Sequence, residues 1–232
     1  MKNEKKVILI TGGSQGLGKE IAKTLYKDNL VVVLSNDKKS LEETMAELSI
    51  EGFYADVTNP VDLESAVSKV NEKLGKIDIL INNAGVWAGG ALDTNSYDDI
   101  AKVLMVNTLG VIYATRAVLP LMKKQGFGKI INIGSTNGIE TKPDRSVYIA
   151  SKWAITGFTG ALRKELEQFN ISVMGINPGL MSTNLHKNGG VERDYTCAMD
   201  PVEVSKVIQF AVDMKDIVIE NITFRNLHCE LN

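Results

Sequence analysis

The fold is decided near the start of the chain, by the stretch Val7-Ile8-Leu9-Ile10-Thr11-Gly12-Gly13-Ser14-Gln15-Gly16-Leu17-Gly18. Its first four residues form an apolar, β-branched run that is typical of a strand buried on both faces. Behind the glycines, Ile21, Ala22 and Leu25 recur at helical spacing. A strand, a glycine turn and a helix in this order bring the first N–H groups of the helix to the end of a central strand. Partial positive charge gathers there, so the pattern predicts a phosphate-binding turn. Taken alone, the loop also fits an ordinary glycine-rich turn.

Strand-like apolar runs alternate with helical patterns along the rest of the chain. The runs are Val31–Leu34, Ile77–Ile81, Lys129–Ile133, Ile171–Ile176 and Asn221–Phe224, and the helical stretches are Lys39–Leu48, Pro60–Leu74, Asp98–Lys124, Tyr148–Glu167 and Pro201–Met214. This alternation predicts an α/β fold, with a three-layer, doubly wound parallel sheet of Rossmann type as a single domain over residues 1–232. Ligands of such sheets bind beyond the carboxyl ends of the strands. Residues 181–200 have no clear element and follow such an end, so we favour a lid over the substrate against a plain surface loop.

Composition narrows the choice of partners. The formal net charge is -2 and 44% of the residues are hydrophobic, so no basic field indicates nucleic acid or an anionic membrane. No stretch is apolar enough for a membrane span or a signal-peptide core. Cys197 and Cys229 are interpreted as free thiols of a cytoplasmic protein, with a disulfide as the alternative. His186 and His228 are too isolated to predict a metal site.

Tyr148 and Lys152 carry the predicted chemistry. They stand four residues apart at the start of a predicted helix, so they share a face. A phenol of pKa about 10 is a poor proton-transfer group near neutral pH. An ammonium about 4 Å away, at an effective dielectric constant of about 20, contributes roughly 4 kcal/mol, or about three pKa units. The phenol could then protonate a carbonyl or deprotonate an alcohol. Without the glycine loop, the pair would fit two ordinary residues of an amphipathic helix.

Two further polar residues stand at positions that favour a role in the site. Ser135 follows the strand Lys129–Ile133 and Gly134, where its hydroxyl can hydrogen-bond a substrate oxygen. It also fits the opening of the loop that leads to Gly138. Asn107 lies inside an apolar helical stretch, where an amide is costly unless it is hydrogen-bonded. A structural asparagine and a catalytic one both fit this position.

Six motifs in this order resemble those of the short-chain dehydrogenase/reductase family, over essentially the whole chain. They are Thr11-Gly12-x-x-x-Gly16-x-Gly18, Asn82-Asn83-Ala84-Gly85, Asn107, Ser135, Tyr148-x-x-x-Lys152 and Pro178-Gly179-x-x-x-Thr183. The resemblance implies an NAD(P)(H)-dependent oxidoreductase that interconverts a carbonyl and a secondary alcohol by hydride transfer. It implies that Tyr148 is the general acid/base, that Ser135 positions the substrate oxygen, and that Lys152 also binds ribose. The family's residue at Asn107 bends its helix and holds a water that relays protons.

Hydride transfer needs a cofactor, because no side chain supplies a hydride. The predicted cofactor-binding residues are Gly12, Ser14, Gln15, Gly16, Leu17, Gly18, Ser35, Asn36, Asp56, Val57, Asn83, Ala84, Gly85, Tyr148, Lys152, Pro178, Gly179, Met181 and Thr183. Asp56 resembles a residue that contacts adenine, and it also fits the cap of the helix that begins near Pro60. Asn82 and Asn83 are expected to tie neighbouring strands together.

The choice between NAD and NADP rests on the end of the second strand. NAD-specific sites usually carry an acid there, whereas this chain has Leu34-Ser35-Asn36-Asp37. Ser35 stands at the position of the acid, and Asn36 stands where NADP-type members often have Arg. Without the acid, a 2′-phosphate meets no repulsion at that position, although Asp37 opposes it if it turns inward. We therefore favour NADP(H) over NAD(H).

The substrate pocket is less sharply predicted. Ser135, Asn137, Tyr148 and Trp87 are the candidate substrate contacts, and the candidate walls are Trp87, Ala88, Leu92, Asn137, Ile139, Leu185 and Tyr195. The helical stretches Asp98–Lys124 and Tyr148–Glu167 resemble those that pair subunits in the family, so a homodimer or homotetramer is expected. Two rival functions are a non-catalytic nucleotide-sensing relative and a dehydratase or epimerase of the same family. The substrate and the physiological direction are not encoded in these motifs.

Overall fold

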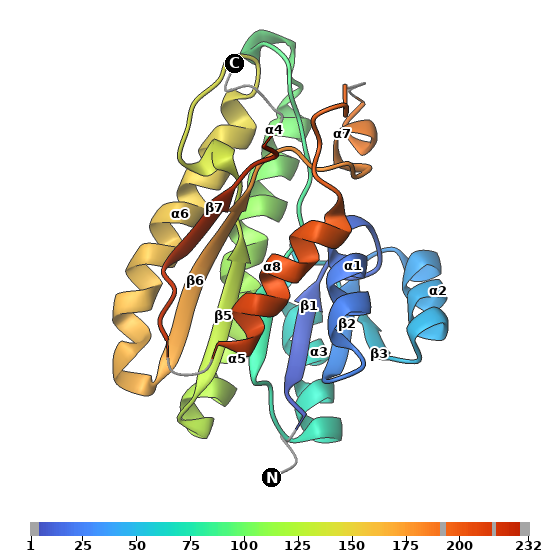
Figure 1. The fold of residues 1–232 in the computed structure, drawn as a ribbon, viewed down its shortest axis with the longest axis vertical. Helices are drawn as coiled ribbons and strands as arrows, with labels where there is room; N and C mark the ends of the chain where they lie inside the picture. Colours follow the sequence, from blue (N-terminus) through green and yellow to red (C-terminus); the bar gives the residue numbers. More distant parts are fainter. Residues whose placement is uncertain (1–4, 191–193, 215–216, 228–232) are drawn as a thin grey trace.

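A seven-stranded parallel sheet forms the centre of the protein (Figure 1). The structure is a computed structural model and describes residues 5–190, 194–214 and 217–227. The strand order is β3-β2-β1-β4-β5-β6-β7. The strands are β1 (Val7–Thr11), β2 (Leu30–Ser35), β3 (Glu51–Tyr54), β4 (Ile79–Asn82), β5 (Gly128–Ile133), β6 (Ile171–Pro178) and β7 (Asn221–Phe224). The order reverses between β1 and β4, which opens a crevice at the carboxyl ends of these two strands.

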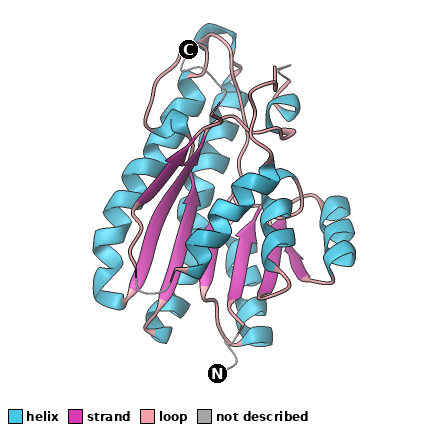
Figure 2. Cartoon of the chain, viewed as in Figure 1, coloured by secondary structure: helices cyan, strands magenta, loops and turns pink. Residues whose placement is uncertain are grey.

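Helices cover both faces of the sheet (Figure 2). They are α1 (Gly16–Leu25), α2 (Lys38–Leu48), α3 (Pro60–Leu74), α4 (Tyr97–Leu104), α5 (Gly110–Gln125), α6 (Ser146–Leu166), the short α7 (Leu185–Asn188) and α8 (Pro201–Asp213). Successive residues of β1 point to opposite faces. Val7 and Leu9 pack in a core with residues of α3, α5 and α6, whereas Ile8 and Ile10 pack with residues of α1, α2 and α8. The strand is apolar throughout because both of its faces are covered.

The structure confirms the predicted α/β, doubly wound sheet and corrects two elements. The strand Glu51–Tyr54 was not predicted. It is a short edge strand that contains Gly52 and is only partly buried, so it lacks the apolar run that marks the central strands. The predicted helix Asp98–Lys124 is interrupted by a turn of π-helix over Met105–Leu109, which apolar periodicity does not reveal.

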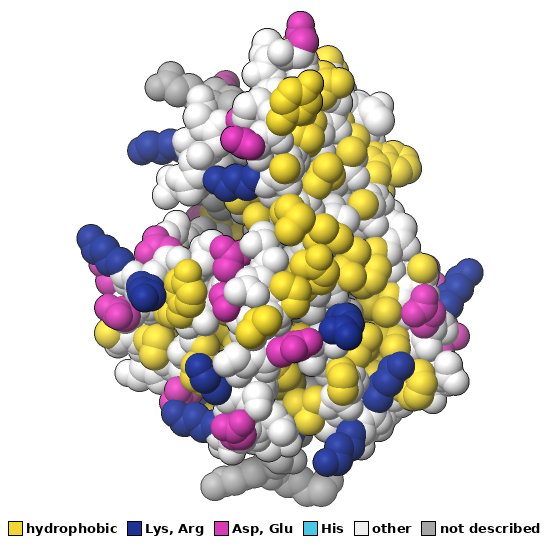
Figure 3. Space-filling model, turned by 180° about the vertical axis from the view of Figure 1, so that it is seen from behind, with side chains coloured by type: hydrophobic (Ala, Val, Ile, Leu, Met, Phe, Trp, Pro, Cys, Tyr) yellow, Lys and Arg dark blue, Asp and Glu magenta, His cyan; other side chains and the backbone are white. Residues whose placement is uncertain are grey.

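The helical segment Tyr97–Gln125 is long and apolar enough to cross a membrane, by length and composition only. No such segment was expected from the sequence. About 39% of its most apolar window is buried, because α5 packs against α3 and against strands β4 and β5. Figure 3 shows the face of the molecule opposite to that of Figure 1, and hydrophobic side chains gather over it. The apolar character of the segment therefore serves the core on one side and an exposed face on the other.

Candidate active site

The glycine loop brings the backbone of β1 close to the end of β4. Gly12 has a φ of 62°, and a Cβ built there would lie 2.9 Å from the Cα of Ala84. Gly16, which begins α1, has a φ of 49°. Both conformations favour glycine, so the loop can present its backbone without side chains. Gly18 lies against the Gly12 carbonyl and the Asn83 amide, which makes it a packing residue that does not line the cavity described below.

The amino end of α1 has no side-chain cap. Gln15 occupies the N-cap position, but its side chain makes no capping hydrogen bond. Its Nε2 donates instead to Oδ2 of Asp37, at 2.8 Å. The first N–H groups of α1 are therefore left for another acceptor at the mouth of the crevice. A phosphate is the acceptor that such a helix terminus favours.

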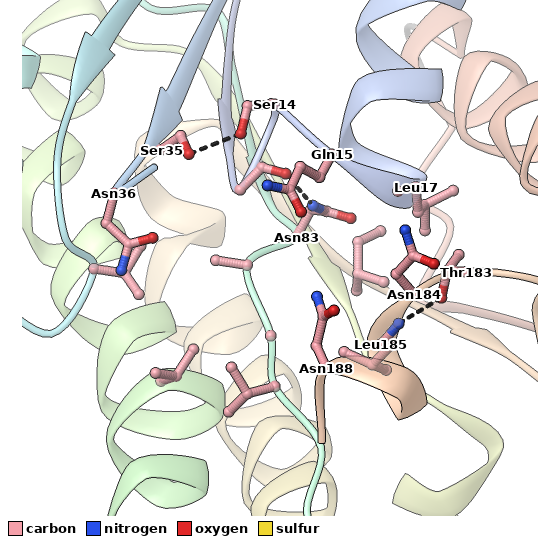
Figure 4. A pocket seen from close by; sticks show the side chains of 18 of the residues that line it. Ser14, Gln15, Leu17, Ser35, Asn36, Asn83, Thr183, Asn184, Leu185 and Asn188 are labelled. Atoms are coloured by element: carbon pink, nitrogen blue, oxygen red, sulfur yellow. Dashed lines mark hydrogen bonds between the residues drawn. The ribbon is translucent and has the colours of Figure 1, made fainter. Parts of the chain in front are cut away.

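A cavity of about 420 Å³ follows the carboxyl ends of the strands, from Ser35 and Asp56 to Tyr148 and Lys152. Figure 4 shows Ser14, Gln15, Ser35 and Asn36 on one side of it and, on the other, Thr183, Asn184, Leu185 and Asn188. Of the predicted cofactor residues, those that line it are Gly12, Ser14, Gln15, Gly16, Leu17, Ser35, Asn36, Asp56, Val57, Asn83, Ala84, Gly85, Tyr148, Lys152, Met181 and Thr183. Pro178 and Gly179 line a second cavity instead. The uncapped helix, the bare glycine loop and the elongated cavity fit a dinucleotide.

Asp56 does not cap the following helix. The N-cap of α3 is Asn59, whereas Asp56 accepts hydrogen bonds from the backbone and hydroxyl of Thr58 and from Nδ2 of Asn36. Burial raises the pKa of the Asp56 carboxyl, but these hydrogen bonds outweigh it and hold the pKa below its usual value. Asp56 is therefore an anion at neutral pH, held at the wall of the cavity.

The two asparagines after β4 tie strands together, as expected. Asn82 Nδ2 donates to Oδ1 of Asn132 at 2.9 Å and to Thr115. Asn83 Nδ2 donates to the carbonyls of Thr11 and Gly12, at 3.1 and 3.0 Å. These bonds hold the ends of β1, β4 and β5 in fixed positions around the crevice.

Tyr148 and Lys152 lie on one face of α6, and each residue is 6% exposed. The Nζ of Lys152 donates to the carbonyl of Ile133 at 2.9 Å and lies 5.8 Å from the centre of the Tyr148 ring. Burial lowers the pKa of the Lys152 ammonium to about 8, so this group is a cation at neutral pH and loses its charge in mildly alkaline solution. Two unit charges about 6 Å apart interact by about 3 kcal/mol at an effective dielectric constant of about 20, so the ammonium favours the phenolate form of Tyr148.

Ser135 and Asn107 approach the same region from different elements. Ser135 follows β5, is 8% exposed, and its Oγ accepts a hydrogen bond from the backbone N–H of Asn137 at 3.1 Å. Asn107 is fully buried in the π-helical turn. Its Oδ1 accepts from Val86 N at 2.8 Å, and its Nδ2 donates to Val86 O and to Ser151 Oγ. The Asn107 side chain therefore fixes the chain after β4 against α6, and both of its polar atoms are satisfied.

A second cavity, of about 450 Å³, adjoins the first at Tyr148. Ser135, Asn137, Trp87 and Leu185, all predicted to contact or enclose the substrate, line it. The ring of Trp87 lies 4.4 Å from that of Tyr148, centre to centre. Both cavities share Gly134, Tyr148, Met181, Thr183 and Leu185 among the described residues. A molecule in the second cavity would therefore meet one in the first at the Tyr148 side chain.

Four of the predicted walls lie outside the residues that line either cavity. Ala88 packs with Val103 and Val147 in a small separate core. Leu92 and Ile139 are exposed to solvent. Tyr195 donates its hydroxyl hydrogen to the carbonyl of Thr183, so it supports the segment that covers the site.

Several lining residues were not predicted from the sequence, namely Lys142, Arg145, His186 and Arg225. Arg225 comes directly after β7, and Lys142 and Arg145 lie in the loop between β5 and α6. A search for long polar side chains just beyond strand ends would have found Arg225. His186 lies on α7, with its ring 4.6 Å from that of Trp87, and no local sequence signal indicates this contact.

Described residues of segment 181–200, for which we favour a lid, line the two cavities. Met181 and Met199 form an isolated parallel bridge, which closes the base of the segment. Thr183, Asn184, Leu185 and Asn188 face the first cavity, as Figure 4 shows. Residues 191–193 lie outside the described part of the chain.

Comparisons with known proteins agree with this geometry. The family model for short chain dehydrogenases matches residues 6–193. An uncharacterized oxidoreductase of Staphylococcus saprophyticus is 33% identical over 228 residues, which cover 95% of this chain and 97% of the relative. The crystal structure of 3-ketoacyl-(acyl-carrier-protein) reductase from Brucella melitensis, complexed with NADH, superposes with a TM-score of 0.89 and 28% identity, over 96% of this chain and 98% of that chain. The structure of an alcohol dehydrogenase from the archaeon Thermococcus sibiricus, complexed with 5-hydroxy-NADP, superposes with a TM-score of 0.86 and 25% identity, over 99% of this chain and 100% of that chain.

Proposed function

Because the chain belongs to the short-chain dehydrogenase/reductase family of oxidoreductases, we propose that it interconverts a carbonyl and a secondary alcohol with NAD(P)(H), using Tyr148 as the general acid/base. The observation that carries this proposal is the position of Tyr148 where two cavities meet, with a buried lysine on the same helix face. The cofactor would supply or accept the hydride in the first cavity. The substrate would lie in the second.

The proposed roles follow from the contacts of each side chain. Tyr148 gives its hydroxyl proton to the carbonyl oxygen, or takes a proton from the alcohol. Lys152, a cation at neutral pH, stabilises the phenolate that this transfer leaves. Ser135 would hydrogen-bond the same substrate oxygen, since its hydroxyl lines the second cavity. Asn107 anchors α6 through Ser151. We also propose that Asn107 holds a water that relays protons to the site.

NADP(H) remains the favoured cofactor. Where NAD-specific sites have a carboxylate, the hydroxyl of Ser35 accepts a hydrogen bond from that of Ser14 at 2.7 Å, and the hydroxyl oxygens of Ser40 and Ser14 lie 2.9 Å apart. Lys38 lies nearby with its ammonium 5.3 Å from the centre of the Tyr54 ring. Asp37 opposes a 2′-phosphate, but its carboxylate is engaged by the backbone of Ser40 and the amide of Gln15. The relatives include one complex with NADH and one with an NADP derivative.

We further propose that the face formed by α4, α5 and α6 pairs two copies of the chain. Large hydrophobic side chains are exposed on α4 and α6, namely Tyr97, Leu104 and Trp153, and Figure 3 shows the apolar area on this side of the molecule. Burying such an area against a second copy would remove it from water. A homodimer or homotetramer is the expected assembly.

Mixing the purified protein with NADPH or NADH and a panel of ketones tests the proposed reaction. We expect loss of the absorbance of the reduced coenzyme with at least one ketone. Tight coenzyme binding with no turnover across the panel would contradict the proposal and would favour a nucleotide-sensing role.

A further inference from the structure

The ring of Tyr148 packs against a second, buried aromatic ring. Trp87 lines the second cavity, is 7% exposed, and has its ring centre 4.4 Å from that of Tyr148, with an angle of 51° between the two ring planes. Tyr148 itself lines both cavities, so open space borders its side chain. Packing against Trp87 therefore restricts the rotation of the Tyr148 ring on the side that faces the second cavity.

The backbone on both sides of Trp87 is fixed by close contacts. Before it, the N–H and the carbonyl of Val86 are hydrogen-bonded to the side chain of Asn107, at 2.8 and 2.9 Å. After it, a Cβ at Gly89 would lie 2.8 Å from the Nε1 of Trp87, so the chain turns back against the indole where no side chain would fit. The loop after β4 therefore holds Trp87 from its own backbone outward.

On its other side, Trp87 meets the segment around α7. The buried His186, on α7, has its ring centre 4.6 Å from that of Trp87, and its Nδ1 lies 3.3 Å from the hydroxyl of Tyr195. Gly189 packs closer still, since a Cβ there would lie 2.6 Å from the Trp87 carbonyl oxygen and 3.0 Å from the Trp87 Cδ1. The rings of Tyr148, Trp87 and His186 therefore form a continuous row from the proposed acid to α7.

The short helix α7 has two different neighbours. Leu185 and Asn188 line the first cavity, as Figure 4 shows, whereas His186 and Gly189 pack on Trp87. Gly189 lines neither cavity. The α7 segment therefore touches the proposed coenzyme cavity with one side and the aromatic row with the other.

We propose that Trp87 is a positioning residue for the reaction: the α7 segment packs Trp87 against Tyr148, and this packing holds the phenol within reach of the substrate oxygen. This inference rests on the proposed function of Tyr148. A general acid must lie within about 2.6–3.2 Å of the atom that it protonates, and a displacement of about 1 Å can lower a rate by about 100-fold. The rate of the reaction therefore depends on Gly189, a residue outside both cavities.

Gly189→Ala tests this dependence with a single methyl group. Gly189 has a φ of -89° and a ψ of 12°, a conformation that alanine can adopt, so the new methyl group acts through its clash with Trp87. In stopped-flow measurements at saturating reduced coenzyme and ketone, we expect the rate of hydride transfer to fall by about tenfold or more. Lys187→Ala, at an exposed position of the same helix that lines neither cavity, should keep the wild-type rate.

Two substitutions of His186 separate ring packing from the polar contacts of the imidazole. His186→Ala removes the ring that packs on Trp87, and the rate should fall by about tenfold. His186→Phe keeps a ring at that position, and the rate should return to within about threefold of the wild type. A His186→Phe protein as slow as His186→Ala would overturn the packing argument.

The fluorescence of Trp87 shows whether the change in rate passes through the indole. The chain has two tryptophans, so a Trp153→Phe background leaves the emission of Trp87. In this background, Gly189→Ala should change the wavelength or the intensity of the emission, and Lys187→Ala should leave both unchanged. A slower reaction with an unchanged emission, or a changed emission with the wild-type rate, would overturn the proposal.

The same measurements distinguish a failure of this inference from a failure of the proposed reaction. If the wild type reduces ketones and Gly189→Ala reduces them at the same rate, the positioning role is wrong and the oxidoreductase reaction stands. If the wild type reduces no ketone, the proposed reaction is contradicted, and the emission alone decides on the contact. An unchanged emission in Gly189→Ala would then overturn the packing of α7 on Trp87, and a changed emission would support it.

Discussion

Replacing Lys152 with Met tests the electrostatic part of the mechanism. The change keeps most of the length of the side chain and removes its charge. The lost charge lies 5.8 Å from the centre of the Tyr148 ring, and its interaction with a phenolate is about 3 kcal/mol at an effective dielectric constant of about 20. This energy corresponds to about two pKa units. The apparent pKa of the base in alcohol oxidation should therefore rise by about two units, and kcat/KM near neutral pH should fall by roughly 100-fold.

The assay is the pH profile of alcohol oxidation at saturating oxidised coenzyme, which separates this effect from the weaker coenzyme binding that we also expect. The wild-type protein has the full benefit of the cation only below about pH 8, the pKa to which burial lowers the Lys152 ammonium. The matched control is Lys164→Met, an exposed lysine of the same helix. A Lys152→Met profile with the same apparent pKa as the wild type would refute the reasoning.

Three further predictions follow from the same contacts. Burial lowers the pKa of Lys152 from 10.5 to about 8, so below about pH 8 its charge destabilises the native state by about 3 kcal/mol, and this cost disappears as the pH rises through 10.5. In urea unfolding, the free energy of unfolding of the wild type should therefore rise by about 3 kcal/mol relative to that of Lys152→Met between neutral and alkaline pH. A difference between the two proteins that stays constant with pH would contradict this prediction. Ser35→Asp should shift the preference from NADPH toward NADH by more than about tenfold in kcat/KM, because the new carboxylate repels a 2′-phosphate, whereas the exposed Ser65→Asp should not. Trp153→Glu should dissociate the expected oligomer, because it places a charge in the proposed interface, and light scattering would measure the mass. Val61→Glu, on α3, is the control. An unchanged mass for Trp153→Glu would argue against the α4–α6 face.

The layered sheet could be predicted because the central strands are apolar along their length. Ile8 and Ile10 face one core and Val7 and Leu9 the other, so the whole strand reads as apolar. The edge strand Glu51–Tyr54 is half-covered and contains a glycine. It therefore lacks this signal, and its place became clear only from its pairing with β2. The π-helical turn at Asn107 is set by tertiary hydrogen bonds to Val86 and Ser151, which local periodicity does not contain.

The candidate site was likewise predictable in part: sequence spacing indicated some contacts, and others depend on tertiary structure. Tyr148 and Lys152 share a helix face, so four-residue spacing was sufficient to place them together. Spacing could not give the 5.8 Å separation, because Lys152 turns to the Ile133 carbonyl. Arg225 and Glu140 are 85 residues apart in the chain and meet only because β7 pairs beside β6. Contacts of this kind depend on strand order, which the sequence motifs did not specify.

The central claim is tested most directly by Tyr148→Phe, which removes one hydroxyl from the meeting point of the two cavities. With any ketone that the wild type reduces, we predict a fall in kcat of at least about 100-fold, as expected when a general acid is lost, with coenzyme affinity unchanged within a factor of about two, since the ring remains. Tyr113→Phe, on α5 and outside both cavities, should retain the wild-type rate. A Tyr148→Phe protein that keeps a kcat close to that of the wild type would contradict the account.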